Sequence, residues 1–244
     1  MHIGLLECDH VAGRFPGIAG GYREMFAALL GPHAPGLRFT YYDACHGGLP
    51  ATPDACDAYL CTGSQFSVYD SFGWIGGLAG FLQRLHELRK PFVGICFGHQ
   101  MLAQALGGEV RRAAQGWGVG VLDMKILRQE AWMQPAQARC RLQYMHQDQV
   151  QRLPADSVVL GQSEHCEVAM LRVGETMLGI EGHPEFTRAY HQALIRSRAA
   201  RIGAERAQAA LASLDQPTDG PVVGRWIAEF LQRKAQRPPP SFFE

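Results

Sequence analysis

Short apolar segments alternate with segments of helical spacing through the first half of the chain. Buried strands are predicted at residues 2–8, 37–42, 58–61 and 91–96, and helices at 22–30, 74–88 and 99–106. The helix at 74–88 has the clearest pattern, because Leu78, Phe81, Leu82 and Leu85 recur at helical spacing. This order of elements predicts a mostly parallel sheet with helices on both faces.

The pattern changes after about residue 118. Strand-like segments at 119–127, 141–145, 157–160, 168–173 and 177–180 follow one another without long helices between them. Residues 188–214 return to helical spacing with a break near Gly203, and a last helix is predicted at 222–234. We therefore expect a three-layer α/β fold, in which a mostly parallel central sheet has helices on both faces and a small antiparallel excursion laid against it.

No linker along the 244 residues is long enough to separate two domains, and 47% of the residues are hydrophobic. This amount of apolar surface suits one sizeable core. We expect a single domain over residues 1–236 and a loose C-terminal tail, 237–244, which contains three prolines.

Charge and cysteine usage exclude several classes of function. The 23 Lys and Arg balance the 23 Asp and Glu, so no net field attracts nucleic acid or a membrane surface. The N-terminus has no export signal, and no apolar run approaches the ~18 residues of a membrane span. Seven cysteines without a CxxC pair argue against a disulfide framework and a thiolate zinc site. We expect a cytoplasmic protein.

No metal or cofactor is expected either. The pairs of potential ligands lack metal-site spacing: His146 and Asp148, His165 and Cys166, and His183 and Glu185. The arginines at 196, 198, 201 and 206 are interpreted as the solvated face of a helix.

Cys96 lies where a hydrophobic strand runs into a helix, in the segment Gly94-Ile95-Cys96-Phe97-Gly98. A side chain at such a turn stands above the sheet edge, where the positive end of the helix lowers a thiol pKa. Gly94 and Gly98 occupy positions at which a side chain would strike the neighbouring strand or helix. The alternative is an inert, buried cysteine, which is what most free cysteines in strands are.

His183 and Glu185 follow a predicted strand, two residues apart. In extended backbone such side chains point to the same side, so the carboxylate can orient the imidazole toward a third group. A cysteine paired with an oriented histidine can attack an acyl carbon without metal or cofactor. These residues indicate thiol acyl transfer.

In this chain order, residues 94–100 and Gly182-His183-Pro184-Glu185 resemble the nucleophile and His-Pro-Glu motifs of class I glutamine amidotransferases. Residues 60–70 resemble the glycine loop of that family. Residues 144–150 resemble the Ser-His-x-Asp segment of its GMP-synthase-like branch, and the chain as a whole resembles a free-standing domain of that branch. The resemblance covers about residues 1–188.

The resemblance implies a flavodoxin-like fold and a catalytic triad of Cys96, His183 and Glu185 acting on a γ-glutamyl amide. It implies an oxyanion hole formed by the backbone N–H groups of Phe97 and Ser64, although the family usually has a second glycine or a proline where this chain has Ser64 and Gln65. Substrate contacts are implied for Gly63, Gln100, Met145, Gln147 and Asp148. His99 and His146 are expected to support the site from outside the triad.

Three functions remain open at this point. The first is hydrolysis of glutamine to glutamate and ammonia through a Cys96 thioester, by a stand-alone enzyme or by a glutaminase subunit whose partner synthase accepts the ammonia. The second is an independent γ-glutamyl peptidase acting on γ-glutamyl peptides or conjugates. The third is a catalytically silent scaffold, against which the intact set of candidate catalytic residues argues.

Overall fold

A nine-stranded mixed sheet forms the centre of the molecule, in the order β2-β1-β3-β4-β11-β10-β9-β6-β7. This computed structural model describes residues 1–15, 17–18 and 20–235, so the predicted tail at 237–244 lies outside the described residues. The strands are β1 (His2–Leu6), β2 (Arg38–Tyr42), β3 (Ala58–Cys61), β4 (Phe92–Ile95), β6 (Gly118–Ile126), β7 (Arg139–His146), β9 (Ser157–Ser163), β10 (Met170–Val173) and β11 (Met177–Ile180).

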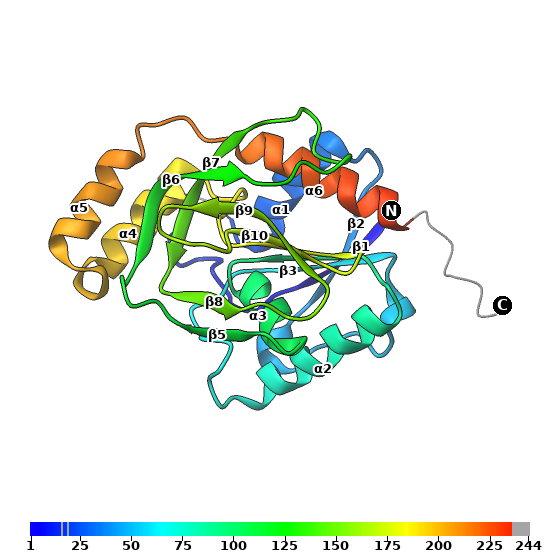
Figure 1. Cartoon of the computed structure of the whole chain (residues 1–244). Helices are drawn as coiled ribbons and strands as arrows, with labels where there is room; N and C mark the ends of the chain where they lie inside the picture. The colour runs from blue at the N-terminus through cyan, green and yellow to red at the C-terminus, as the bar shows by residue number, and fades with distance from the viewer. Residues whose placement is uncertain (16, 19, 236–244) are drawn as a thin grey trace, which may run out of the picture.

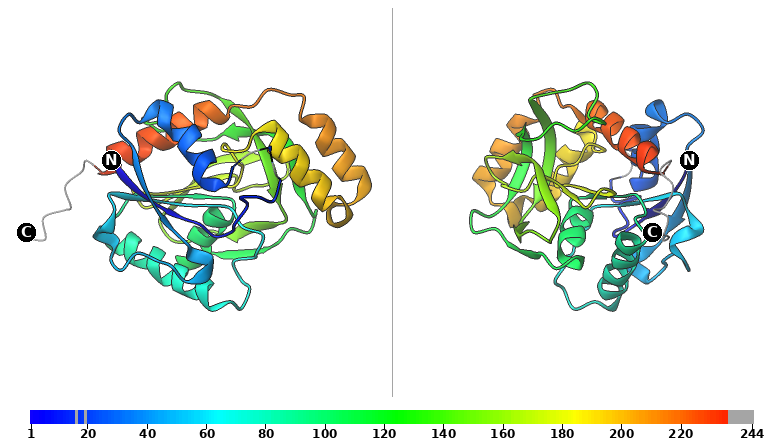
Figure 2. Two further views of the ribbon diagram at one scale, coloured as in Figure 1. Left: turned by 180° about the vertical axis from the view of Figure 1, so that it is seen from behind. Right: turned by 45° about the vertical axis from the view of Figure 1, so that its right-hand side comes forward.

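Helices cover both faces of this sheet (Figures 1 and 2). On one face lie α1 (Tyr22–Leu30) and α6 (Gly220–Ala235), and on the other lie α2 (Gly73–Glu87) and α3 (Phe97–Ala105). Beyond the antiparallel end, α4 (Arg188–Ile202) and α5 (Ala204–Ser213) pack beside β6. The expected α/β fold with helices on both faces is confirmed, as is the break at Gly203, whose φ is 94°.

The strands β2, β1, β3, β4 and β11 are parallel neighbours. Successive residues of a strand point to opposite faces of the sheet. The continuous apolar runs in this part therefore place apolar side chains on both faces. In β4, Val93 and Ile95 pack into the core that includes α1 and α6, while Phe92 packs into the core of α2 and α3. The carboxyl ends of the parallel strands meet at one sheet edge, where the chain leaves each strand in a loop or helix.

The antiparallel part differs from the prediction in its placement. β10, β9, β6 and β7 continue the central sheet, so they do not lie against it. β11, expected among the antiparallel pieces, pairs with β4 in parallel and so belongs to the first part of the sheet. A separate two-stranded sheet of β5 (Glu109–Arg112) and β8 (Asp148–Arg152) was not predicted, because its polar, partly exposed residues lack an apolar run.

The turn between β4 and α3 depends on two glycines. A Cβ atom at Gly94 would lie 2.2 Å from the carbonyl oxygen of Gly98, and one at Gly98 would lie 2.6 Å from that of Cys61. The steric reason predicted for these glycines is therefore confirmed. Helix α3 begins at Phe97, two residues earlier than expected.

Among the described residues, no helix combines the length and apolar character needed to cross a bilayer.

Replacing Gly94 with alanine should destabilise the fold. The new methyl group would press on backbone atoms that cannot move aside, so we expect a loss of about 3 kcal/mol in the free energy of unfolding. Gly80→Ala is the matched control, because Gly80 lies in α2 with no atom within 4 Å of its added Cβ. The free energy of unfolding of that control should rise by about 1 kcal/mol, because alanine has a higher helix propensity than glycine. Equal urea midpoints for the two variants would contradict the packing argument.

Candidate active site

Cys96 has a strained backbone conformation at the junction of β4 and α3. Its φ is 51° and its ψ is −102°, a combination that costs a non-glycine residue about 1–3 kcal/mol. The surroundings hold this geometry, since the Cys96 N–H donates to the carbonyl of Ile180 at 2.8 Å and its own carbonyl accepts from the N–H of Gln100 at 2.9 Å. The side chain is thereby presented at the carboxyl edge of the parallel strands.

His183 is fixed on the same edge, just after β11. Its backbone N–H donates to the carbonyl of Gln143 at 2.7 Å, and its Nδ1 lies 2.7 Å from Oε1 of Glu185. The imidazole also stacks on Phe186, with ring centroids 3.9 Å apart and an interplanar angle of 8°. Since Nδ1 faces a carboxylate, it carries the proton and Nε2 is left as the basic nitrogen.

Cys96 and His183 both lie beside Gly63. A Cβ atom at this position would lie 2.9 Å from Cε1 of His183 and 3.8 Å from Cβ of Cys96. The two side chains therefore flank the same point of the loop after β3, and only a residue without a side chain leaves the space between them open. The three segments that the sequence motifs singled out converge here.

A cavity beside Cys96 contains most of the other predicted site residues. Its lining includes Ser64, Phe97, Gln100, Met145, His146, Gln147 and Asp148. His99 is fully buried behind it, with Nε2 3.5 Å from Oε2 of Glu181. A larger cavity of about 600 Å³ opens behind Glu185, but Cys96 is not part of its lining. The candidate active site is the smaller cavity, because Cys96 is part of its lining.

Several hydrogen bonds connect the residues around this cavity. The Gln100 amide donates to the backbone carbonyl of Asp148 and to Oε1 of Glu181, each at 2.9 Å. The Asp148 carboxylate accepts from the hydroxyls of Ser67 at 2.5 Å and Tyr69 at 2.9 Å. The Asp148 side chain is thus held by two residues of the glycine loop, and its backbone carbonyl is held by Gln100.

Glu181 is a residue of the site that sequence reasoning missed. It is completely buried, and burial raises its pKa well above that of an ordinary glutamate, although hydrogen bonds from Gln100 and Cys96 partly oppose this shift. Besides Gln100, its oxygens face His99 at 3.5 Å and His146 at 3.6 Å. The available signal was a carboxylate at the end of an apolar strand, two residues before His183.

The expected lowering of the Cys96 thiol pKa is wrong. Burial raises this pKa well above its usual value, and the charges of Glu181 and Glu185 raise it further. The N–H of Phe97, at the start of α3, only partly opposes this effect. Desolvation thus outweighs the helix terminus, and the resting thiol keeps its proton until a base takes it.

Two arginines expected on a solvated helix face line the cavity instead. They are Arg198 and Arg201, one turn apart on α4. The Arg201 guanidinium lies 5.6 Å from the ring centroid of Trp117, which also lines the cavity. In the part of the chain that the structure describes, no hydrogen bond or ion pair holds the Arg198 guanidinium, and burial lowers its pKa. The cavity therefore offers positive charge to an anionic group.

Comparisons with known proteins agree on one family. Residues 60–201 match the model described as glutamine amidotransferase class-I. γ-Glutamyl peptidase 4 of Arabidopsis thaliana is 30% identical over 176 residues, which are 69% of each protein. The glutamine-hydrolysing GMP synthase subunit of Pyrococcus abyssi is 29% identical over 131 residues, 53% of this chain and 69% of that protein.

The fold matches solved structures as well. The crystal structure of a glutamine amidotransferase from Thermotoga maritima has a TM-score of 0.74 and 20% identity, over 97% of this chain and all of that one. At this identity the match concerns the fold alone.

Replacing Glu181 with glutamine should lower the pKa of the Cys96 thiol. The substitution keeps the shape but removes a carboxyl group that disfavours the thiolate once it is ionised. We expect the pH profile of iodoacetamide labelling at Cys96 to move down by about one unit, which corresponds to about 1.4 kcal/mol of lost repulsion. Glu87→Gln, on exposed helix surface, is the control and should leave the profile in place. A profile that stays or moves upward would show that Glu181 does not act on the thiol.

Proposed function

The chain belongs to the glutamine amidotransferase class-I family, and on that premise we propose that it hydrolyses the amide bond of a γ-glutamyl compound through a thioester at Cys96. One observation carries this proposal. Cys96, in its strained turn, and His183 both border the position that a side chain at Gly63 would fill, and Nδ1 of His183 lies 2.7 Å from the carboxylate of Glu185.

In the first half-reaction, Nε2 of His183 takes the thiol proton as the sulfur attacks the γ-carbonyl carbon. The imidazolium then gives this proton to the leaving nitrogen, so the C–N bond breaks and a glutamyl thioester remains on Cys96. Water attacks the thioester with His183 again as the base, and glutamate and free thiol are released. Glu185 stabilises the imidazolium in both steps. A neutral resting thiol suits this concerted proton transfer.

The negative charge that develops on the carbonyl oxygen needs nearby donors. We assign this role to the backbone N–H groups of Phe97 and Ser64, each contributing about 10²–10³ in rate. Both residues line the cavity, and the Phe97 N–H lowers the pKa of the Cys96 thiol in part, against the raising effect of burial. The Ser64 hydroxyl donates to the carbonyl of Cys8 at 2.7 Å, which anchors the glycine loop.

The glutamyl end of the substrate would contact Gly63, Gln100, Met145, Gln147 and Asp148, while His99 and His146 support these contacts from behind. Arg198 and Arg201 are left facing the rest of the cavity. Glutamine, with ammonia as leaving group for a synthase subunit, gives these guanidinium groups no second anion. A γ-glutamyl peptide does, because its leaving group ends in a carboxylate.

The arginines therefore favour the γ-glutamyl peptidase alternative, to which the similarity with γ-glutamyl peptidase 4 adds support.

A reducing compartment such as the cytoplasm is part of the same proposal, because the cysteines are free thiols, including Cys8 and Cys61 with sulfur atoms 3.4 Å apart.

Variants of the three catalytic candidates test the chemistry. Cys96→Ala should abolish hydrolysis of glutamine and of γ-glutamyl peptides while the circular dichroism spectrum stays unchanged, because the turn accepts a small side chain. His183→Ala should lower kcat/KM by about 10⁴ or more, and Glu185→Gln by less, because Glu185 orients the base without carrying the transferred proton. Equal losses in the last two variants would contradict these roles, and full activity of Cys96→Ala would refute the proposal.

Arg198→Gln tests the choice of leaving group. We expect kcat/KM for γ-glutamylglycine to fall by about tenfold or more, the value of one charge-assisted hydrogen bond, while kcat/KM for glutamine stays the same. Arg196→Gln, at an exposed position of the same helix, is the control and should change neither. If both substrates lose activity equally in Arg198→Gln, this arginine binds the glutamyl portion and the argument for a peptide substrate fails.

A further inference from the structure

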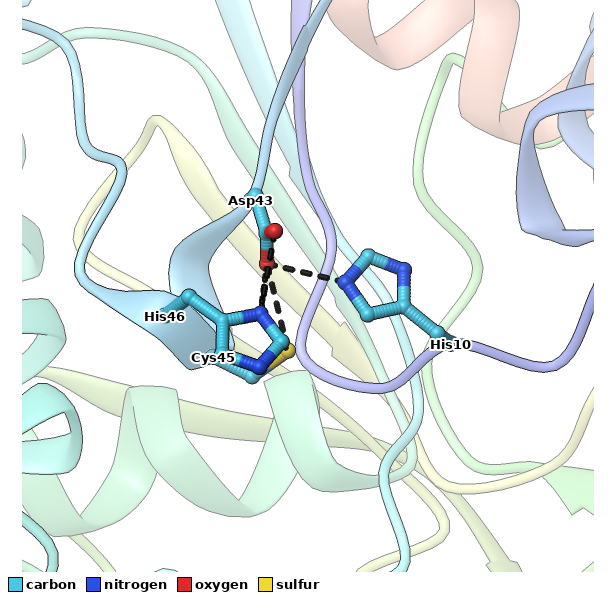
Figure 3. A group of neighbouring side chains, drawn as sticks. All are labelled: His10, Asp43, Cys45 and His46. Carbon is cyan, nitrogen blue, oxygen red and sulfur yellow. Dashed lines mark hydrogen bonds and ion pairs between the residues drawn. The ribbon is translucent and has the colours of Figure 1, made fainter.

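Four potential metal ligands meet beyond the carboxyl ends of β1 and β2, apart from the cavity at Cys96. They are His10, in the loop after β1, and Asp43, Cys45 and His46, in and just before the short 3-10 helix η2 (Ala44–His46). One ligand atom from each residue lies within 4.8 Å of the others. Figure 3 shows the other three side chains turned toward the Asp43 carboxylate.

The distances from Asp43 to the other three ligand atoms are close to those of a tetrahedral metal site. Oδ1 of Asp43 lies 2.9 Å from Nε2 of His10, 2.9 Å from Nδ1 of His46 and 3.3 Å from the sulfur of Cys45. Around a tetrahedral zinc ion with bonds of about 2.0–2.3 Å, ligand atoms stand about 3.3–3.8 Å apart. Side-chain shifts of about 1 Å would therefore accommodate the ion.

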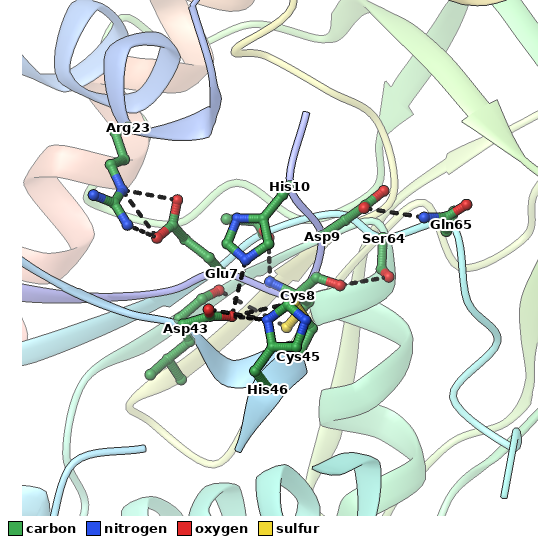
Figure 4. Close-up of polar contacts among 12 residues, drawn as sticks. Glu7, Cys8, Asp9, His10, Arg23, Asp43, Cys45, His46, Ser64 and Gln65 are labelled. Atoms are coloured by element: carbon green, nitrogen blue, oxygen red, sulfur yellow. Dashed lines mark hydrogen bonds and ion pairs between the residues drawn. The ribbon is translucent and has the colours of Figure 1, made fainter. Parts of the chain in front are cut away.

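The main chain that carries these ligands is already ordered. The N–H of Cys45 donates to the carbonyl of Glu7 at 3.1 Å, which continues the ladder in which the N–H of Glu7 donates to the carbonyl of Tyr42 at 2.9 Å. The Glu7 carboxylate in turn accepts from Arg23 of α1, at 2.7 Å from its Nη2 (Figure 4). The backbone around Cys45 therefore needs little further ordering when an ion binds.

We propose that His10, Asp43, Cys45 and His46 form a zinc(II) site. Two imidazoles, one thiolate and one carboxylate are a donor set that zinc accepts, whereas magnesium and calcium prefer oxygen ligands. On binding, the Cys45 thiol releases its proton to the solvent, and the thiolate and the carboxylate together balance the two charges of the ion. Sequence spacing could not show this site, because His10 and Asp43 are 33 residues apart.

A metal at this position would fix the loop after β1, which is hydrogen-bonded to the glycine loop of the candidate active site. Two residues just before His10 hold that loop, since the carbonyl of Cys8 accepts from the Ser64 hydroxyl at 2.7 Å and Oδ1 of Asp9 accepts from the Gln65 amide at 3.1 Å (Figure 4). The zinc ion would be structural, with no contact to substrate, and its binding does not depend on the proposed hydrolysis.

Titration of the metal-free full-length protein with cobalt(II) tests the site. We expect one equivalent to bind with the absorption of tetrahedral cobalt and a thiolate-to-cobalt charge-transfer band. Cys45→Ser should remove the band, and both Cys45→Ser and His46→Ala should weaken binding by about 100-fold or more. His33→Ala is the control, because His33 is a partly exposed histidine outside the group, in the 3-10 helix η1 (Gly31–His33).

Zinc should also raise the melting temperature of the wild type and of His33→Ala, but not that of Cys45→Ser. Three results would overturn the site: an octahedral cobalt spectrum without the thiolate band, a band that persists in Cys45→Ser and so comes from another thiol such as Cys96, or no saturation below millimolar cobalt. None of these results depends on enzymatic activity, so a failure of the zinc site is distinguishable from a failure of the proposed function.

Discussion

The close approach of β4 to helix α3 is the constraint on which the rest of the site depends. There is no room for a side chain at Gly94 or Gly98, and this contact leaves Cys96 with a φ of 51°. The strain is retained because β11 and α3 each bind the Cys96 backbone. Since β3, β4 and β11 are parallel, the turn, the glycine loop and His183 all emerge at the same edge, and a parallel sheet thereby turns three distant segments into one site.

Burial governs the electrostatics of this edge. A thiol at the start of a helix was expected to have a lowered pKa, yet removal from water and two nearby carboxylates raise it. The consequence is a resting thiol that is neutral, and in the proposed mechanism His183 is the base that activates it. The nearby Glu181 is itself buried with a raised pKa, which limits the repulsion that a fully charged carboxylate would impose on the thiolate. Arg198 also lines the cavity, and its positive charge acts on the thiol pKa in the opposite direction.

Features set by neighbouring residues could be predicted from the sequence, and features set by distant contacts could not. The turn around Cys96 and the pair His183 and Glu185 were visible because each lies within a few residues of chain. The parallel pairing of β11 with β4 was not, because periodicity reveals a strand but not its neighbour. The same limit explains why the role of Arg198 was missed. In the sequence its spacing is that of an ordinary solvated helix face, and only the packing of α4 beside the cavity shows that it lines the site.

The central claim is that Cys96 forms a covalent glutamyl intermediate. The most direct test is acid quenching of the protein during turnover of a γ-glutamyl substrate, followed by peptide mapping with mass spectrometry. The account predicts a glutamyl group on the peptide that contains Cys96, formed as fast as the amine is released. Release of the amine with no modification of that peptide, or a glutamyl group on another residue, would contradict it.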